Sequence, residues 1–125
     1  MTITSIIVTP NLDRLSTFYR ELFSATETTR VPEDGPIFYL GLKVGDSDLG
    51  LVSDEGAELS TRQRILLSVQ VDNVDSLLDR VRTLGGRVLS PPNDMPWGQR
   101  VGHVEDPDGN AINLTHPTRA SVVRG

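Results

Sequence analysis

The chain has 125 residues, 17 of them acidic and 12 basic, so its net charge is −5 and its length is that of one domain that can bury a core. The basic residues are scattered and cysteine is absent, which argues against nucleic acid as a partner and excludes disulfides, thiolate metal sites and a cysteine nucleophile. There is neither an apolar run of membrane-spanning length nor a signal-peptide pattern, so we expect a cytoplasmic protein with no membrane partner.

The first half of the chain predicts a strand, a helix and three further strands. An apolar run at Ile3–Val8 comes first, and a helix then begins at Asn11, a good N-cap. Phe18, Tyr19 and Phe23 follow helical spacing, which indicates core residues and not cofactor contacts. Segments 26–31, 36–44 and 48–52 follow as strands, separated by turn compositions at 33–35 and 45–46. Phe38 and Tyr39 are neighbours on one of these strands, so one faces a cavity and the other the helices, and the sequence does not decide which.

The second half repeats this order at a constant offset of 62 positions (74 − 12). The helical positions that correspond are Asn11, Leu12, Asp13, Leu15, Tyr19, Arg20 and Leu22 with Asn73, Val74, Asp75, Leu77, Val81, Arg82 and Leu84. Chance similarity between two amphipathic helices is the alternative, and the flanking strands argue against it. An apolar run at 65–71 precedes the second helix, Gly85 and Gly86 close it, and strands are predicted at 87–89, 99–105 and 111–115. The chain is therefore predicted to be a single domain, 1–125, of two βαβββ modules at about 3–53 and 65–116.

A turn near the end of the chain is its most specific local motif. Residues 104–116 read VEDPDGNAINLTH, with strand-like segments on both sides of a proline, an aspartate and a glycine. Pro107 presets φ for the second turn position, Asp108 tolerates the third, and Gly109 accepts a positive φ. The motif predicts a β-hairpin.

A strand, DPDGN and a strand, at the end of two βαβββ repeats, resemble the vicinal oxygen chelate superfamily from about Ile3 to His116. That superfamily includes glyoxalase I, extradiol dioxygenases, fosfomycin-resistance enzymes and bleomycin-resistance proteins. The resemblance implies an α+β fold in which two tandem modules form curved mixed sheets around a cavity, with the helices on the outer side. It also implies a homodimer.

The same resemblance implies metal ligands on the first and last strands of each module, and the matching residues are of the wrong type. The chain has only two histidines, His103 and His116, both in its last quarter. The first strands offer Thr4, Ser5, Thr9, Ser68 and Gln70, with Leu66 beside them, and the last strand offers Asn113 where such enzymes usually carry glutamate. Divalent ions prefer carboxylate and imidazole, so we expect neither a metal nor another cofactor.

One alternative metal site remains open. His103 and Glu105 are two residues apart on a predicted strand and face the same side, so they could join a site whose other ligands come from elsewhere. In the simpler interpretation His103 hydrogen-bonds inside a polar cavity, Glu105 is a charge at the rim, and His116 is a solvent-exposed strand end. Glu105 or Asp106 could act as general acid or base, although carboxylates in turns are ordinarily solvated.

The remaining candidate is a binding cavity for a small molecule. PWGQR followed by DPDGN is similar to the metal-free, drug-sequestering branch of the superfamily. Trp97 is expected at the cavity mouth, where it stacks on a ligand, and the alternative is that it plugs the seam between the modules. The other predicted ligand-binding residues are Gln99, Arg100 and His103 on one strand, Ser68, Gln70 and Asn113 on neighbouring strands, and Phe38, Tyr39 and Glu105.

Two functions follow from these observations. The first is a metal-independent protein that binds or sequesters an antibiotic or another aromatic or cationic natural product. The second is a metal-dependent lyase, isomerase or dioxygenase with an atypical ligand set. The missing metal ligands favour binding over catalysis, and the sequence identifies no catalytic residue.

Overall fold

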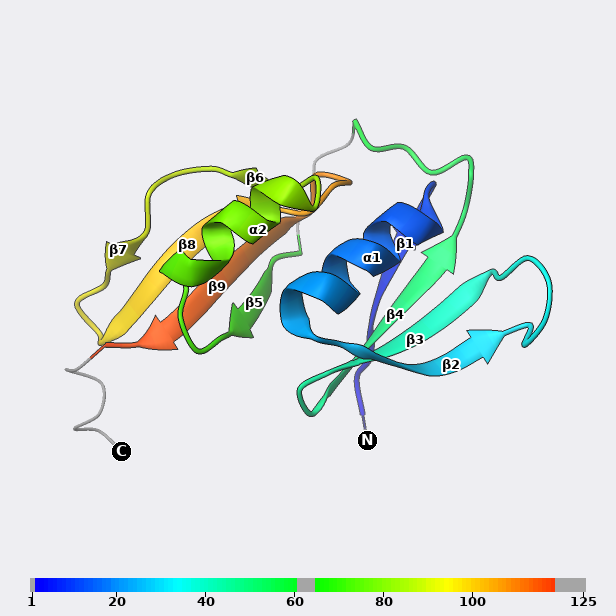
Figure 1. The fold of residues 1–125 in the computed structure, drawn as a ribbon, viewed down its shortest axis with the longest axis horizontal. Coiled ribbons are helices and arrows are strands. Elements are labelled where there is room, and N and C mark those ends of the chain that lie inside the picture. The colour runs from blue at the N-terminus through cyan, green and yellow to red at the C-terminus, as the bar shows by residue number, and fades with distance from the viewer. Residues whose placement is uncertain (1, 61–64, 119–125) are drawn as a thin grey trace. The chain divides into compact units, whose positions relative to one another are not determined.

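The fold was analysed in a computed structural model, which describes residues 2–60 and 65–118. The chain divides into two compact units, residues 1–61 and 62–125, and each unit contains one sheet with helical structure against one face (Figure 1). The predicted α+β class with two βαβββ modules is confirmed. Among the described residues, no helix has the length and apolar character needed to span a membrane.

The first unit is a four-stranded mixed sheet with one helix. Its elements are β1 (Ser5–Thr9), α1 (Leu12–Phe23), β2 (Thr26–Val31), β3 (Tyr39–Val44) and β4 (Ser47–Ser53). The strand order is β1-β4-β3-β2, with β1 parallel to β4 and the other neighbours antiparallel. The third strand begins three residues later than the predicted 36–44, since the proline at position 36 has no N–H for the ladder.

Helix α1 forms for the reasons that its sequence indicates. The Asn11 side chain accepts a hydrogen bond from the Arg14 N–H at 3.0 Å, which caps the first turn. Ser24, in the left-handed conformation at φ 54°, ends the helix. Phe18 and Tyr19 are 0% and 1% exposed, as predicted for core residues.

The second unit is a five-stranded mixed sheet. Its elements are β5 (Leu67–Gln70), the 3₁₀ turn η1 (Asp75–Leu77), α2 (Leu78–Thr83), β6 (Arg87–Val88), β7 (Asn93–Asp94), β8 (Gln99–Glu105) and β9 (Ala111–Pro117). The order is β5-β9-β8-β6, with β7 also paired to β8, and only β5 and β9 are parallel. The sequence predicts no strand at the position of the short strand β7.

The second helix is shorter than predicted. A single helix from Asn73 was expected, but its first part is a 3₁₀ turn and α2 has only six residues. Aspartate, asparagine and serine, which dominate residues 72–76, are weak helix formers because their side chains compete for backbone hydrogen bonds. Asn73 still caps the segment, since its Oδ1 accepts from the Ser76 N–H at 3.2 Å. Gly85, at φ 93°, ends it as predicted.

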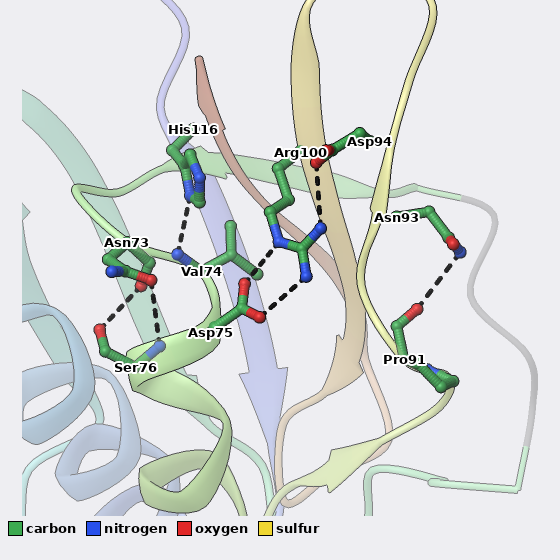
Figure 2. A network of polar contacts seen from close by, with 9 residues as sticks. All are labelled: Asn73, Val74, Asp75, Ser76, Pro91, Asn93, Asp94, Arg100 and His116. Carbon is green, nitrogen blue, oxygen red and sulfur yellow. Dashed lines mark hydrogen bonds and ion pairs between the residues drawn. The ribbon is translucent and has the colours of Figure 1, made fainter. Parts of the chain in front are cut away.

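His116 is not the exposed strand end that the sequence predicts. It lies within β9, half-buried, and its Nδ1 accepts a hydrogen bond of 2.9 Å from the backbone N–H of Val74 (Figure 2). The proline at position 117 suggested a strand end, but β9 continues through that residue. His116 therefore holds the start of η1 against β9.

Arg100 joins three elements on the same side of the sheet. It donates to both carboxylate oxygens of Asp75 at 2.6 and 2.9 Å and to Asp94 at 3.0 Å, so η1, β7 and β8 are held together (Figure 2). These hydrogen bonds from Arg100 lower the pKa of the Asp75 carboxyl below its ordinary value. Arg100 lies on the same strand as Gln99 and His103, but its side chain is on the opposite face of the sheet, because successive residues of a strand face opposite sides. The prediction that it lines a cavity together with them is wrong.

The predicted turn is present at residues 106–110, where the Gly109 N–H donates to the Asp106 carbonyl oxygen at 2.9 Å. Gly109 has a φ of 88°, as predicted for the position that requires a positive φ. Asp106 has a larger part than the sequence suggests. It is 2% exposed, and its carboxylate accepts hydrogen bonds from the backbone N–H groups of Asp108 and Asn110, both at 2.9 Å. The expectation of a solvated turn carboxylate is therefore wrong for Asp106, which organises the turn.

Candidate functional site: a cleft on the open face of the second sheet

The two faces of the second sheet differ in what covers them. On one face η1 and α2 pack against β8 and β9, and a Cβ atom added to Gly102 would lie only 2.7 Å from Val74 Cγ1. The buried residues of this face are Val104, Ile112 and Leu114. The other face, which we call the open face, has no helix of its own unit on it. Strand alternation assigns Gln99, Val101, His103 and Glu105 of β8 to the open face.

Strand register brings the predicted polar residues onto this face. His103 of β8 is paired with Asn113 of β9, and Asn113 with Ser68 of β5. Gln70 is paired with Thr115, one step further along the same face. Six predicted residues from three strands therefore share the open face: Ser68, Gln70, Gln99, His103, Glu105 and Asn113.

A cleft of about 420 Å³ opens at one end of this face. Its lining residues are Leu66, Leu89, Ser90, His103, Val104, Ala111, Ile112 and Asn113. Leu66 and Leu89 are large apolar residues that are 52% and 45% exposed. The size and the mostly apolar lining are those of a small-molecule site.

His103 and Asn113 form the polar group of the cleft. His103 Nδ1 lies 2.7 Å from Asn113 Oδ1, and both residues are half-buried. The second imidazole nitrogen, Nε2, has no hydrogen-bond partner among the described residues. The cleft thus combines apolar walls with one directional polar group. His103 is hydrogen-bonded as predicted, but the surrounding cavity, predicted to be polar, is mostly apolar.

Glu105 and Arg87 lie one step along the sheet from this pair. The register pairs these two residues, and Arg87 Nη1 is 3.5 Å from Glu105 Oε1. Neither residue lines the cleft. The negative charge of Glu105 is therefore compensated close by, as expected for a rim charge.

The other predicted ligand-binding residues of this unit lie outside the cleft lining. Ser68 and Gln70 are exposed on β5, and Gln99 is at the far end of β8. Trp97 is 66% exposed, and its Nε1–H donates to Gln99 Oε1 at 2.8 Å. The indole is therefore not part of the buried core of the second unit. Its part in ligand binding stays a prediction.

Sequence reasoning missed Leu89, Ser90 and Ala111. Leu89 and Ser90 follow the two-residue strand β6, and the Leu89 N–H donates to the His103 carbonyl oxygen at 2.9 Å, which aligns Leu89 with His103. Ala111, opposite Glu105, places only a methyl group on the open face and leaves room for the cleft. Strand register was needed to place this segment beside His103.

Phe38 and Tyr39 lie in the first unit and are separated by the start of β3. Tyr39 lies on the face away from α1, where its ring crosses Gly50: a Cβ added there would be 2.7 Å from the tyrosine hydroxyl oxygen. Phe38 precedes the strand and is 57% exposed, so the prediction that both are on one strand is wrong. Tyr39 is the one of the two that faces away from the helix.

The residues present do not fit a divalent metal ion. Within the two described ranges, no three His, Asp or Glu side chains are grouped so that they could hold one. Of the positions at which the family resemblance predicts metal ligands, Leu66 directly precedes β5 and Asn113 lies on β9. A leucine side chain cannot bind an ion, and an amide is a weak neutral donor.

In sequence, the chain matches one family profile and is related to known mycobacterial proteins. The profile of the Glyoxalase/Bleomycin resistance protein/Dioxygenase superfamily matches residues 2–114. An uncharacterized protein of Mycobacterium bovis is 30% identical over 112 residues, which cover 82% of this chain and 74% of that protein. A Mycobacterium tuberculosis relative is also 30% identical, and the match spans 66% of its length.

Solved structures with low sequence identity share the fold. A glyoxalase/bleomycin resistance protein/dioxygenase family enzyme of Burkholderia phytofirmans superposes with a TM-score of 0.77 at 22% identity, covering 91% of this chain and 96% of that one. The fosfomycin resistance protein FosX of Mesorhizobium loti gives 0.71 at 18% identity, covering 98% and 96%. The bleomycin resistance determinant of transposon Tn5 gives 0.67 at 18% identity, covering 94% and 98%. At these identities the likeness concerns the fold alone.

Proposed function

The chain belongs to the Glyoxalase/Bleomycin resistance protein/Dioxygenase superfamily, and from this premise we propose that it binds or sequesters a small organic molecule in the cleft of its second unit, without a metal ion. The observation that carries the proposal is the His103–Asn113 pair in the lining of a cleft of about 420 Å³ that also contains two exposed leucines, Leu66 and Leu89. Apolar walls supply affinity through burial, and the pair supplies direction.

Metal independence is proposed from the chemistry of the donors. His103 is the one imidazole of the cleft lining, and the groups beside it are an amide and a hydroxyl. Lewis-acid activation of a substrate requires an ion held by stronger ligands. No arrangement of the described residues favours the alternative, a metal-dependent lyase, isomerase or dioxygenase.

The test uses bleomycin and fosfomycin, after which the resistance proteins of similar fold are named, together with a library of small aromatic fragments. Binding is followed by changes in the backbone amide signals of a ¹⁵N-labelled protein in NMR titrations. We expect at least one compound to shift the signals of residues around the cleft. Leu89→Ala removes an exposed wall and should weaken that compound by about tenfold, at roughly 1–2 kcal/mol of lost apolar contact.

The matched control is Leu59→Ala, which truncates another leucine of nearly the same exposure, 44%, that does not line the cleft. It should leave the affinity unchanged. Equal weakening by both variants, or fragment-induced shifts that never include the cleft residues, would place binding elsewhere and refute the proposed site.

A homodimer remains a prediction from the family resemblance, and a cytoplasmic location remains a prediction from the sequence. Sedimentation equilibrium at micromolar concentration should give about twice the chain mass of 13.7 kDa. A strict monomer under these conditions would contradict the expected pairing of subunits.

A further inference from the structure

The hydrogen-bond polarity of the cleft follows from which atoms of His103 and Asn113 meet. Nδ1 of the imidazole lies 2.7 Å from Oδ1 of the amide. An amide oxygen can only accept a hydrogen bond, so Nδ1 carries the proton in this pair. In a neutral imidazole the other nitrogen, Nε2, then has a free lone pair and is an acceptor.

The Asn113 amide offers the opposite polarity. Its Oδ1 is engaged by His103, so its Nδ2 remains as a donor, with no hydrogen-bond partner in the part of the chain that is described. Neither His103 Nε2 nor Asn113 Nδ2 is among the fully buried atoms without a partner in the described residues, so each keeps some exposed surface, and both residues line the cleft. The pair therefore offers one free acceptor and one free donor.

The charges around this pair favour a neutral ligand. Glu105, the nearest carboxylate on the open face of β8, is 3.5 Å from Arg87, so neither a bare negative nor a bare positive charge faces the cleft from this side. The remaining lining side chains are apolar apart from Ser90. An ionised ligand would lose its hydration without gaining an opposite charge.

We infer that the cleft selects a neutral, mainly apolar ligand whose polar group both donates and accepts a hydrogen bond, such as a hydroxyl or a primary amide. The hydroxyl or amide N–H is donated to His103 Nε2, and its oxygen accepts from Asn113 Nδ2. The inference rests on the proposed function for the location of the ligand, whereas the polarity of the pair is a property of the protein alone.

The first experiment measures this polarity without any ligand. Long-range ¹H–¹⁵N correlation spectra at pH 8, where an ordinary imidazole is neutral, distinguish the protonated ring nitrogen from the bare one. The expected result for His103 is a proton on Nδ1. Asn113→Leu removes the acceptor and should abolish this preference, while Asn113→Asp keeps an acceptor oxygen at the same place and should retain it. A proton on Nε2 in the wild-type protein, or an unchanged tautomer in Asn113→Leu, would overturn the inference.

The second experiment compares four probes of one size by NMR titration at pH 8: phenol, anisole, benzylammonium and benzoate. Phenol has the neutral donor and acceptor, anisole lacks the donor, and the other two are charged. We expect phenol to bind about five- to tenfold more tightly than anisole, the effect of one lost hydrogen bond, and more tightly than either ion. Equal binding of phenol and anisole, or preference for an ion, would overturn the inference.

The inferred hydrogen-bond polarity and the proposed binding site can fail separately. If fragments shift the cleft signals but phenol has no advantage, the inference about polarity fails and the proposed binding site stands. If His103 has the expected tautomer but no fragment or drug shifts the cleft signals, the proposed function fails and, with it, the assignment of a ligand class.

Discussion

Replacing Asp106 by alanine should be among the most damaging single changes to the second unit. The carboxylate is 2% exposed and accepts three hydrogen bonds: from the Asp108 N–H at 2.9 Å, from the Asn110 N–H at 2.9 Å and from the Asn110 side-chain amide at 2.8 Å. Asp106→Ala removes this acceptor and leaves the backbone of the turn without the group that organises it.

The magnitude follows from the two backbone donors. A buried N–H without an acceptor costs about 1–3 kcal/mol. The Asp108 N–H is buried, so its loss of an acceptor carries the full cost. The Asn110 N–H is half-buried, so a hydrogen bond to water can offset part of the cost there. We therefore expect a loss of about 3 kcal/mol, or a melting temperature lower by about 10 °C. Asp106→Asn keeps one acceptor oxygen and should cost only about 1 kcal/mol.

Urea unfolding followed by circular dichroism measures these differences. The control is Asp46→Asn in the exposed turn between β3 and β4, which should stay within about 0.5 kcal/mol of the wild type. Equal losses for Asp106→Ala and Asp106→Asn would mean that the acceptor oxygen is not the cause. A loss below about 1 kcal/mol for Asp106→Ala would refute the role of this carboxylate in the turn.

Three other measurements test the fold and the absence of a metal requirement. Gly102→Ala places a Cβ 2.7 Å from Val74 Cγ1 and should cost about 1–3 kcal/mol in urea unfolding; no change would mean that η1 does not pack closely on β8. Because the folded-state pKa of Asp75 is lowered by the Arg100 hydrogen bonds, its contribution to stability is complete above its ordinary pKa of 3.8 and disappears as the pH falls through the lowered value. Asp75→Asn should remove this part of the acid sensitivity. If the melting temperature of this variant falls between pH 6 and pH 2 as steeply as that of the wild type, the stabilising role of the Asp75 carboxylate is contradicted. Elemental analysis should find no stoichiometric divalent ion and EDTA should leave the melting temperature unchanged; about one ion per chain together with destabilisation by EDTA would contradict metal independence.

Local chemistry and periodicity predicted much of the fold. The Asn11 cap and the Pro107–Gly109 turn are short-range features, because each depends on residues that are close in the sequence. The 62-residue offset is a repetition of one local pattern, so it is also visible without the tertiary structure. Strand alternation also placed His103 and Glu105 on one face, since that rule needs only the position of the strand. These are the features for which the sequence alone was sufficient.

Strand register and long-range side-chain contacts decided the rest. His103 meets Asn113 only because β8 and β9 pair in one particular register, and Leu89, which follows β6, joins them through a hydrogen bond to β8. The hydrogen bond from Val74 to His116 spans 42 positions, so the sequence did not indicate that this half-buried histidine would contact the start of η1. A residue's chemistry is visible in the sequence, but its partner is set by packing between distant segments, so the cleft and its polarity emerged only from the tertiary structure.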